Sequence, residues 1–377
     1  PTGTTYSWGL PIITGGITGA TAESGQTSFQ QTLVNPTNTV QTATYTITAS
    51  TLGCSTTTFS ILVTVKPQPT VSATPLTQTV CSGIDIAAIS FTNPNGVLGT
   101  ITYNWSRDNT TNVTGGIANS GSGASITGKL YNNTNTPQTT IFSVTATSSP
   151  DGCTSAPFNV SVIVNPNPTV AATPATQNVC SESNITPIVL SNPNGVGGTT
   201  YSWTRTNNNA NLTGIPDGTG NTISGALTNN TNAAITTVFT ITATSNGCNI
   251  NTTTATVTVN PKPTVAVNLA TQTVCGNSPI ANIVISNPNT VAGVTYSWTR
   301  TTNANLSGIA TNGSGSTISG TFVNSSNTNQ TTIFTVRATA GSCYSETTTT
   351  VIVKPTPAVV ATPATQTICN NTAASIA

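Results

Sequence analysis

The residues with the most distinctive chemistry in this chain are its eight cysteines, because two of them recur in every stretch of about 95 residues. Their number is even, and the chain contains no histidine and no Cys-x-x-Cys motif, so the usual zinc-binding patterns are missing. Regular pairs of cysteines then favour disulfide bonds in an oxidising compartment outside the cytoplasm. The disulfide candidates are Cys54, Cys81, Cys153, Cys180, Cys248, Cys275, Cys343 and Cys369.

No pattern typical of a catalytic or metal site recurs with the cysteines. General acid–base catalysis usually depends on a group that titrates near neutral pH, and the chain offers no histidine for that role. Its seven carboxylates do not fall at matching positions in successive repeats, and no Asp-rich calcium loop is present. The sequence therefore predicts no catalytic, cofactor-binding or metal-binding residue, no cofactor, and a protein that is not an enzyme.

Two further motifs define the repeat that carries the cysteines, a Tyr-x-Trp motif and a Pro-x-Pro motif, and self-similarity at a fixed period is typical of tandem arrays. The predicted boundaries are 1–66 for a partial repeat with its later strands, 67–165, 166–260 and 261–354 for complete repeats, and 355–377 for the first strand of another. Because the chain starts and stops inside a repeat, we expect it to be an excerpt of a longer polypeptide. The motif tryptophans are Trp8, Trp105, Trp203 and Trp298.

Each repeat has the pattern of a β-sandwich. Phe142, Val144 and Ala146 alternate with polar residues, as in a strand with one buried face, and no segment has the 3.6-residue apolar period of a helix. About seven short strands with one tryptophan on the third are typical of an immunoglobulin-like sandwich, so the predicted fold class is all-β. In the third repeat the expected strands are about 169–173, 185–191, 199–206, 222–227, 237–244 and 252–259, with a short edge strand.

Composition excludes two classes of partner. Only 4% of the residues are charged and the net charge is +1, which removes the attraction that nucleic acid or an anionic membrane requires. No apolar run approaches the roughly 18 residues of a membrane span. We therefore expect no nucleic-acid partner and no direct membrane insertion of this segment.

The tryptophans and the recurring cations have both a structural and a functional interpretation. An exposed indole can stack on a sugar, but a tryptophan on the third strand of a sandwich normally anchors the core, so we expect the four tryptophans to be core anchors. The arginines that follow the tryptophan are expected at a solvated strand end: Arg107, Arg205 and Arg300. The lysines near the Pro-x-Pro motifs are expected to stay solvated too: Lys66, Lys262 and Lys354.

Three disulfide schemes suit the spacing: Cys180 with Cys248 inside a repeat, Cys153 with Cys180 across a linker, or Cys81 with Cys248 and Cys180 with Cys343 between neighbours. The two cysteines of one sandwich should lie at opposite poles, roughly 27 to 33 Å apart, whereas the Cα atoms of a disulfide lie within about 7 Å. The pairs between neighbours join loops that face each other across a junction, so we prefer them, with the pair inside a repeat next. Such bonds would stiffen the array into an elongated rod.

The Pro-x-Pro junction, the Ala172–Cys180 stretch, the Tyr-Ser-Trp strand and the Thr242–Cys248 hairpin resemble the PKD-like, immunoglobulin-like repeats of giant Bacteroidota surface adhesins, including gliding-motility adhesins of the SprB type. The resemblance implies type IX secretion of the parent protein, a place on the bacterial cell surface, and an outer-membrane anchoring or motility machinery as partner. It also implies that the parent protein contacts an external surface or a polysaccharide. PKD domains often carry Trp-x-Phe-Gly-Asp-Gly after the third strand, whereas this chain has Trp203-Thr-Arg-Thr.

Two functions follow as hypotheses. The first is a structural stalk of repeats in an extracellular adhesin filament, for attachment or gliding over surfaces. The alternative is a set of weak glycan-binding or protein-binding modules that act through avidity.

Overall fold

A computed structural model describes residues 2–51, 54–360, 362 and 364–375 of the chain, without the side chains of residues 54–56. All regular elements in these ranges are β-strands, and no helix long and apolar enough to cross a membrane is found among the described residues. The chain divides into two compact units, which are described separately. Unit 1 comprises Pro1–Val170, Asn192–Thr200 and Thr242–Thr252, and unit 2 comprises Ala171–Ser191, Tyr201–Ile241 and Thr253–Ala377.

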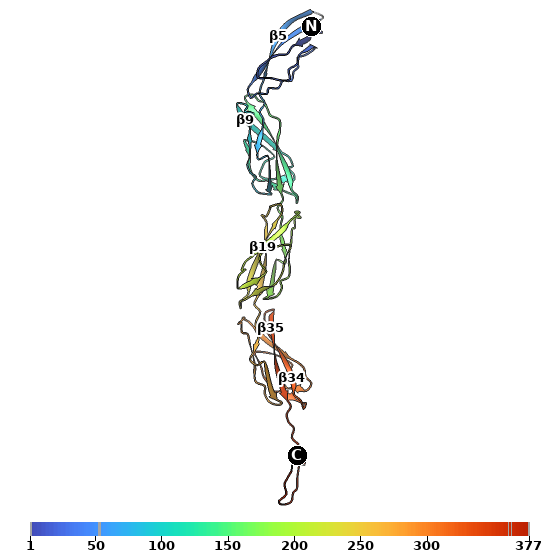
Figure 1. Ribbon diagram of the computed structural model, residues 1–377, viewed down its shortest axis with the longest axis vertical. Coiled ribbons are helices and arrows are strands. Elements are labelled where there is room, and N and C mark those ends of the chain that lie inside the picture. Colours follow the sequence, from blue (N-terminus) through green and yellow to red (C-terminus); the bar gives the residue numbers. More distant parts are fainter. Residues whose placement is uncertain (1, 52–53, 361, 363, 376–377) are drawn as a thin grey trace. The chain divides into compact units, whose positions relative to one another are not determined.

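The second repeat, inside unit 1, shows the complete strand set. Its larger sheet has the order β11-β9-β14-β15-β7, its smaller sheet has the order β12-β8-β6, and β10 pairs with β13. This is an immunoglobulin-like sandwich, as the alternating pattern predicts. Strand β9 of this repeat is labelled in Figure 1. The bounds are β6 Ser72–Thr74, β7 Thr77–Cys81, β8 Ile89–Thr92, β9 Thr100–Arg107, β10 Val113–Thr114, β11 Ser120–Ser122, β12 Ser125–Ile126, β13 Tyr131–Asn132, β14 Gln138–Ser149 and β15 Phe158–Asn165.

The third and fourth repeats have the same sheet orders. The third has β16 Ala171–Thr173, β17 Thr176–Cys180, β18 Ile188–Ser191, β19 Thr200–Arg205, β20 Leu212–Gly214, β21 Gly218–Thr219, β22 Thr222–Ile223, β23 Leu227–Asn229, β24 Ile235–Thr244 and β25 Thr252–Asn260. The fourth has β26 Ala266–Val267, β27 Thr271–Cys275, β28 Ile283–Ser286, β29 Thr295–Arg300, β30 Leu306–Ser307, β31 Asn312–Ser314, β32 Thr317–Ile318, β33 Val323–Asn324, β34 Gln330–Ala340 and β35 Cys343–Lys354. The first repeat has β1 Thr5–Trp8, β2 Ile12–Ile13, β3 Glu23–Gln26, β4 Gln41–Thr51 and β5 Cys54–Val65.

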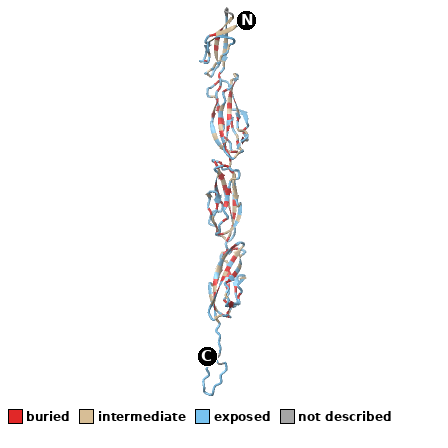
Figure 2. Cartoon of the chain, turned by 90° about the vertical axis from the view of Figure 1, so that its right-hand side faces the viewer, coloured by how far each residue is buried: buried red, intermediate tan, exposed pale blue. Residues whose placement is uncertain are grey.

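The core of each repeat follows from the period-two pattern of its long strands. In the second repeat Phe142, Val144 and Ala146 of β14 are fully buried, and they pack with Val160 and Val162 of the neighbouring β15. Successive side chains of a strand point to opposite faces, so the intervening serines and threonines face outward. In Figure 2 the buried residues accordingly form interrupted stripes along the strands.

The first strand of each complete repeat is split, which the sequence pattern did not predict. In the second repeat β6 pairs with β8 of the smaller sheet, whereas β7 crosses to the larger sheet and pairs in parallel with β15. Pro75 lies between the two halves, and a proline cannot donate a ladder hydrogen bond. The parallel pair ends with Cys81 opposite Asn165, so this cysteine lies where the last strand leaves the repeat, here called the far pole.

Three expectations on strands were wrong. The predicted strand 185–191 begins only at Ile188, and the predicted strand 222–227 is two short strands, β22 and β23, which pair in different sheets. The described residues after Pro355 form no strand, although a first strand was expected within 355–377. In the complete repeats the two halves of the first strand pair with the second and last strands of the same repeat.

Candidate functional site at the junctions between repeats

Disulfide bonds join successive repeats at two junctions. Cys81 at the end of β7 is bonded to Cys248, which lies in the turn after β24, and both belong to unit 1. Cys180 at the end of β17 is bonded to Cys343 at the start of β35, and both belong to unit 2. The Cα atoms of each pair are 5.5 Å apart, within the usual range for a disulfide. These are the two pairs between neighbours that the positions of the poles favoured.

Three of the remaining candidate cysteines form no disulfide bond among the described residues. Cys153 is half-buried, Cys275 and Cys369 are exposed, and all three are free. The scheme that joins Cys153 to Cys180 across a linker is therefore not formed. The side chain of Cys54 lies outside the described residues.

An asparagine, buried in the third and fourth repeats and half-buried in the first and second, holds the end of the last strand at the far pole of every repeat. Asn229 donates from Nδ2 to the carbonyl groups of Ala233, at 2.7 Å, and Val259, at 2.8 Å. Its Oδ1 accepts hydrogen bonds from the N–H and the hydroxyl of Thr231. These bonds use both the donors and the acceptor of the amide, which fixes the loop against the strand. The equivalent residues are Asn35, Asn132 and Asn324.

A second asparagine forms hydrogen bonds with the linker. It belongs to the repeat that follows the linker and lies in the turn after β28 in the fourth repeat. Asn289 donates from Nδ2 to the carbonyl of Lys262, the middle residue of the Pro-x-Pro linker, at 2.9 Å. The backbone N–H of Thr264 donates to Asn289 Oδ1, and the N–H of Asn289 donates to the hydroxyl of Thr264, each at 3.0 Å. The linker is therefore hydrogen-bonded to the repeat that follows it. Asn95 and Asn194 hold their linkers in the same way.

A third set of asparagines donates directly from one repeat to the next. Asn232 Nδ2 lies 3.2 Å from the Thr290 hydroxyl, and the two residues belong to the third and fourth repeats. Asn38 and Asn135 donate in the same way to the carbonyl groups of Gly96 and Gly195. A recurring Asn-x-Thr/Ser-Asn segment begins at residues 35, 132, 229 and 324. Its first asparagine is the far-pole asparagine, and its last one is at the position that donates to the next repeat. This recurrence was the signal in the sequence that could have identified them.

Two of the junction lysines are not simply solvated, contrary to the expectation. Lys66 Nζ lies 3.5 Å from a carboxylate oxygen of Asp151, and Lys262 Nζ lies 3.3 Å from Glu182. Both lysine side chains are more than 40% exposed, so each pair contributes about 0 to 1 kcal/mol. Lys354 is exposed.

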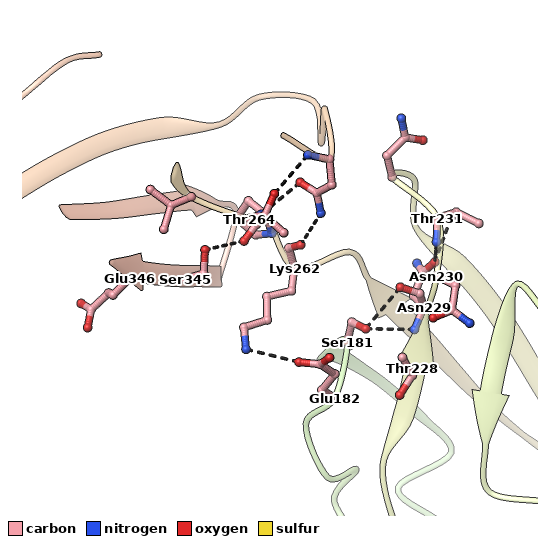
Figure 3. A pocket seen from close by; sticks show the side chains of 14 residues that line it. Ser181, Glu182, Thr228, Asn229, Asn230, Thr231, Lys262, Thr264, Ser345 and Glu346 are labelled. Carbon is pink, nitrogen blue, oxygen red and sulfur yellow. Dashed lines mark hydrogen bonds and ion pairs between the residues drawn. The ribbon is translucent and has the colours of Figure 1, made fainter. Parts of the chain in front are cut away.

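A groove of about 730 Å³ lies at the junction of the third and fourth repeats, inside unit 2 (Figure 3). Glu182 and Asn230 line it from the third repeat, Lys262 from the linker, and Asn289 and Glu346 from the fourth repeat. The walls carry hydroxyl, amide, carboxylate and ammonium groups and no aromatic ring. Among the described residues no group of three metal-ligating side chains could hold a metal ion.

The motif tryptophans lie in the cores of their repeats. Trp8, Trp203 and Trp298 are buried, whereas Trp105 is half-buried and packs edge-on against Phe142. A glycine on the neighbouring edge strand makes room for the ring, since a Cβ on Gly313 would collide with the indole of Trp298. The indole faces are therefore not available as sugar platforms.

The arginines after the tryptophan are buried, which corrects the expectation of a solvated strand end. Arg107, Arg205 and Arg300 are each less than 10% exposed, and burial lowers the pKa of each guanidinium. Arg300 donates to the carbonyl groups of Ile309, Ala310 and Thr301. The loop that follows the third strand turns its carbonyl oxygens inward, and the arginine satisfies them.

The repeats match a known domain family and resemble solved multi-domain structures at low sequence identity. Four segments, residues 1–69, 78–168, 177–263 and 272–357, match the PKD-like domain family. No curated protein matches the chain. Similar solved structures include the titin I-band fragment I67-I69 (8% identity, TM-score 0.38, 78% of this chain and 100% of that chain). Drosophila N-cadherin EC1-4 shares 12% identity (TM-score 0.25, 95% and 93%), as does mouse cadherin-23 EC22-24 (TM-score 0.29, 77% and 99%).

Proposed function

Because the chain belongs to the PKD-like domain family, we propose that its repeats are the structural stalk of a large secreted adhesin, displayed as a filament for attachment or gliding over surfaces. The observation that carries this proposal is the disulfide between neighbouring repeats, which recurs at two successive junctions in one register. A junction held by a linker and a disulfide transmits force and limits bending, which suits a spacer.

The proposal includes the surroundings of the stalk. Disulfides persist outside the cytoplasm, which supports an extracellular location, and we place the parent protein on a bacterial cell surface. Its partners are then an external surface or polysaccharide and an outer-membrane anchoring or motility machinery. The role of the repeats themselves is reach and stiffness.

Small-angle X-ray scattering of the oxidised chain tests the stalk. We expect an elongated particle, whose distribution of interatomic distances broadens in the variant Cys81→Ser/Cys248→Ser because one junction then bends at its linker. The variant Cys153→Ser, which removes a free thiol, is the matched control and should scatter like the wild type. A compact globule for the oxidised chain would contradict the stalk.

The groove at the junction of the third and fourth repeats favours a second candidate function, weak binding of neutral glycans. Asn230 and Asn232 use their Nδ2 groups for protein contacts, and among the described residues their Oδ1 atoms accept no hydrogen bond. These two residues and Glu182, which is paired with Lys262, line the groove and offer acceptor oxygens for sugar hydroxyls, whereas Glu346 is paired with Arg337. The volume of about 730 Å³ lies in the range of small-molecule sites.

Titration of the whole chain with maltotriose, cellotriose and xylotriose, followed by NMR, tests the glycan candidate. Binding in the groove predicts amide shifts at residues 228–232, reduced in Thr228→Val but not in the control Thr213→Val on an exposed part of β20. Shifts that are absent, or that Thr228→Val leaves unchanged, would contradict this site.

A further inference from the structure

The register of the disulfides creates a short covalent route through the array. In every repeat one cysteine lies in the hairpin of the last two long strands, such as β24 and β25, and the next cysteine follows about 27 residues later. The segment between them contains the last strand, the linker and the split first strand of the next repeat. Each disulfide then connects the end of such a segment to the start of another one. One route runs from Cys54 to Cys81, across the bond to Cys248, and on to Cys275.

The second disulfide creates a separate covalent route of the same kind. It runs from Cys153 to Cys180, across the bond to Cys343, and on to Cys369. In the third repeat Cys180 belongs to the second route and Cys248 to the first. The strands between these two cysteines, from β18 to β24, belong to neither route.

We infer that the disulfides act as an extension limit, so that unfolding of a repeat under tension does not lengthen the array. This inference rests on the proposed stalk function and adds to it how the stalk responds to load. Between the linker residues Gln68 and Lys262 the backbone contains about 194 residues, which could extend to roughly 680 Å when unfolded. The route through Cys81 and Cys248 contains about 27 residues and extends to roughly 95 Å.

The limit differs from the stiffening of a junction, because it operates after the non-covalent structure has failed. Stretching loads the parallel pair of β7 and β15, and we expect its hydrogen bonds to break before any covalent bond does. Force then passes to the disulfide, which is covalent. The sandwich strands outside the route can unfold and refold without bearing the load.

Single-molecule pulling of the whole chain, with tethers attached by non-cysteine chemistry at Gln68 and Lys262, tests this inference. The oxidised protein should extend to no more than about 95 Å between tethers, and Cys81→Ser/Cys248→Ser should extend about sevenfold further. The variant Cys180→Ser/Cys343→Ser is the matched control, because its bond does not shorten the route between these tethers, and it should behave like the wild type.

Two results would overturn the inference: full extension of the oxidised chain with Cys81–Cys248 intact by mass spectrometry, or full extension of the control variant. Neither result would contradict the stalk, which the scattering experiment tests separately. A compact particle in scattering combined with limited extension in pulling would contradict the stalk alone.

Discussion

At the scale of single residues, the buried arginines differ in how well they are satisfied. Arg300 makes four hydrogen bonds to carbonyl oxygens and lies 5.3 Å from the ring centre of Phe322. Arg205 donates from Nη2 to Asn208 and Leu212, but its Nε and Nη1 atoms are buried without a partner among the described residues. A buried charge stabilises a fold only when its donors are paired.

We therefore expect Arg300→Met to destabilise the fourth repeat by about 2 kcal/mol, because it leaves buried carbonyl groups unsatisfied. Arg205→Met should change the stability of the third repeat by less than about 1 kcal/mol, since it also removes two unpaired donors. Hydrogen exchange of the core amides in each repeat measures both effects. Equal losses in the two variants would show that hydrogen bonding is not the cause.

The titratable residues predict a simple pH dependence. Burial raises the pKa of Tyr45, Tyr103 and Tyr201 above their ordinary value of 10.0. Above pH 10 the unfolded chain loses these phenolic protons while the folded chain keeps them, so stability falls as the pH rises through the folded-state pKa values. Without histidine the stability should stay nearly constant between pH 6 and 8. Urea unfolding at pH 6, 8 and 11 checks both statements, and Tyr103→Phe should weaken the alkaline loss.

At the scale of elements, the far-pole asparagine connects the loop after the short strands to the last strand. In the variant Asn324→Asp the side chain loses the Nδ2 donors that bind the carbonyl groups of Thr328 and Val353, and it places a negative charge against them. We expect a loss of about 2 to 4 kcal/mol in the fourth repeat, measured by hydrogen exchange. The exposed neighbour Asn327 supplies the control, since Asn327→Asp makes the same chemical change in solvent and should have little effect.

The long strands could be predicted from the sequence, whereas the split of the first strand could not. Alternation specifies the long strands, because burial of one face repeats every two residues, and Phe334, Val336 and Ala338 are all fully buried as expected. The split of the first strand depends on which sheet offers a free edge, and that pairing is tertiary. The burial of Arg107 depends likewise on a loop whose carbonyl groups turn inward. Neither the split of the first strand nor the burial of Arg107 can therefore be predicted from local residue type.

At the scale of the whole molecule, the two disulfides close overlapping loops. Each bond spans residues 181–247, so a backbone cut there leaves the two pieces joined by two bonds. A protease recognition sequence inserted in the exposed loop 207–211 should yield one band after cleavage without reductant and two bands with it. The same insertion at residues 36–39, outside both loops, is the control and should release two pieces without reductant. Release from the 207–211 site without reductant would show that neither bond forms.

The long sequence separation of the bonds has a consequence for biosynthesis. The bonded cysteines are 167 and 163 residues apart, whereas other cysteines lie about 27 residues apart along the chain. In an unfolded chain, random oxidation favours the closure of the shorter loops. The observed pairing therefore implies an order of maturation in which the sandwiches fold and meet first, and their thiols oxidise afterwards.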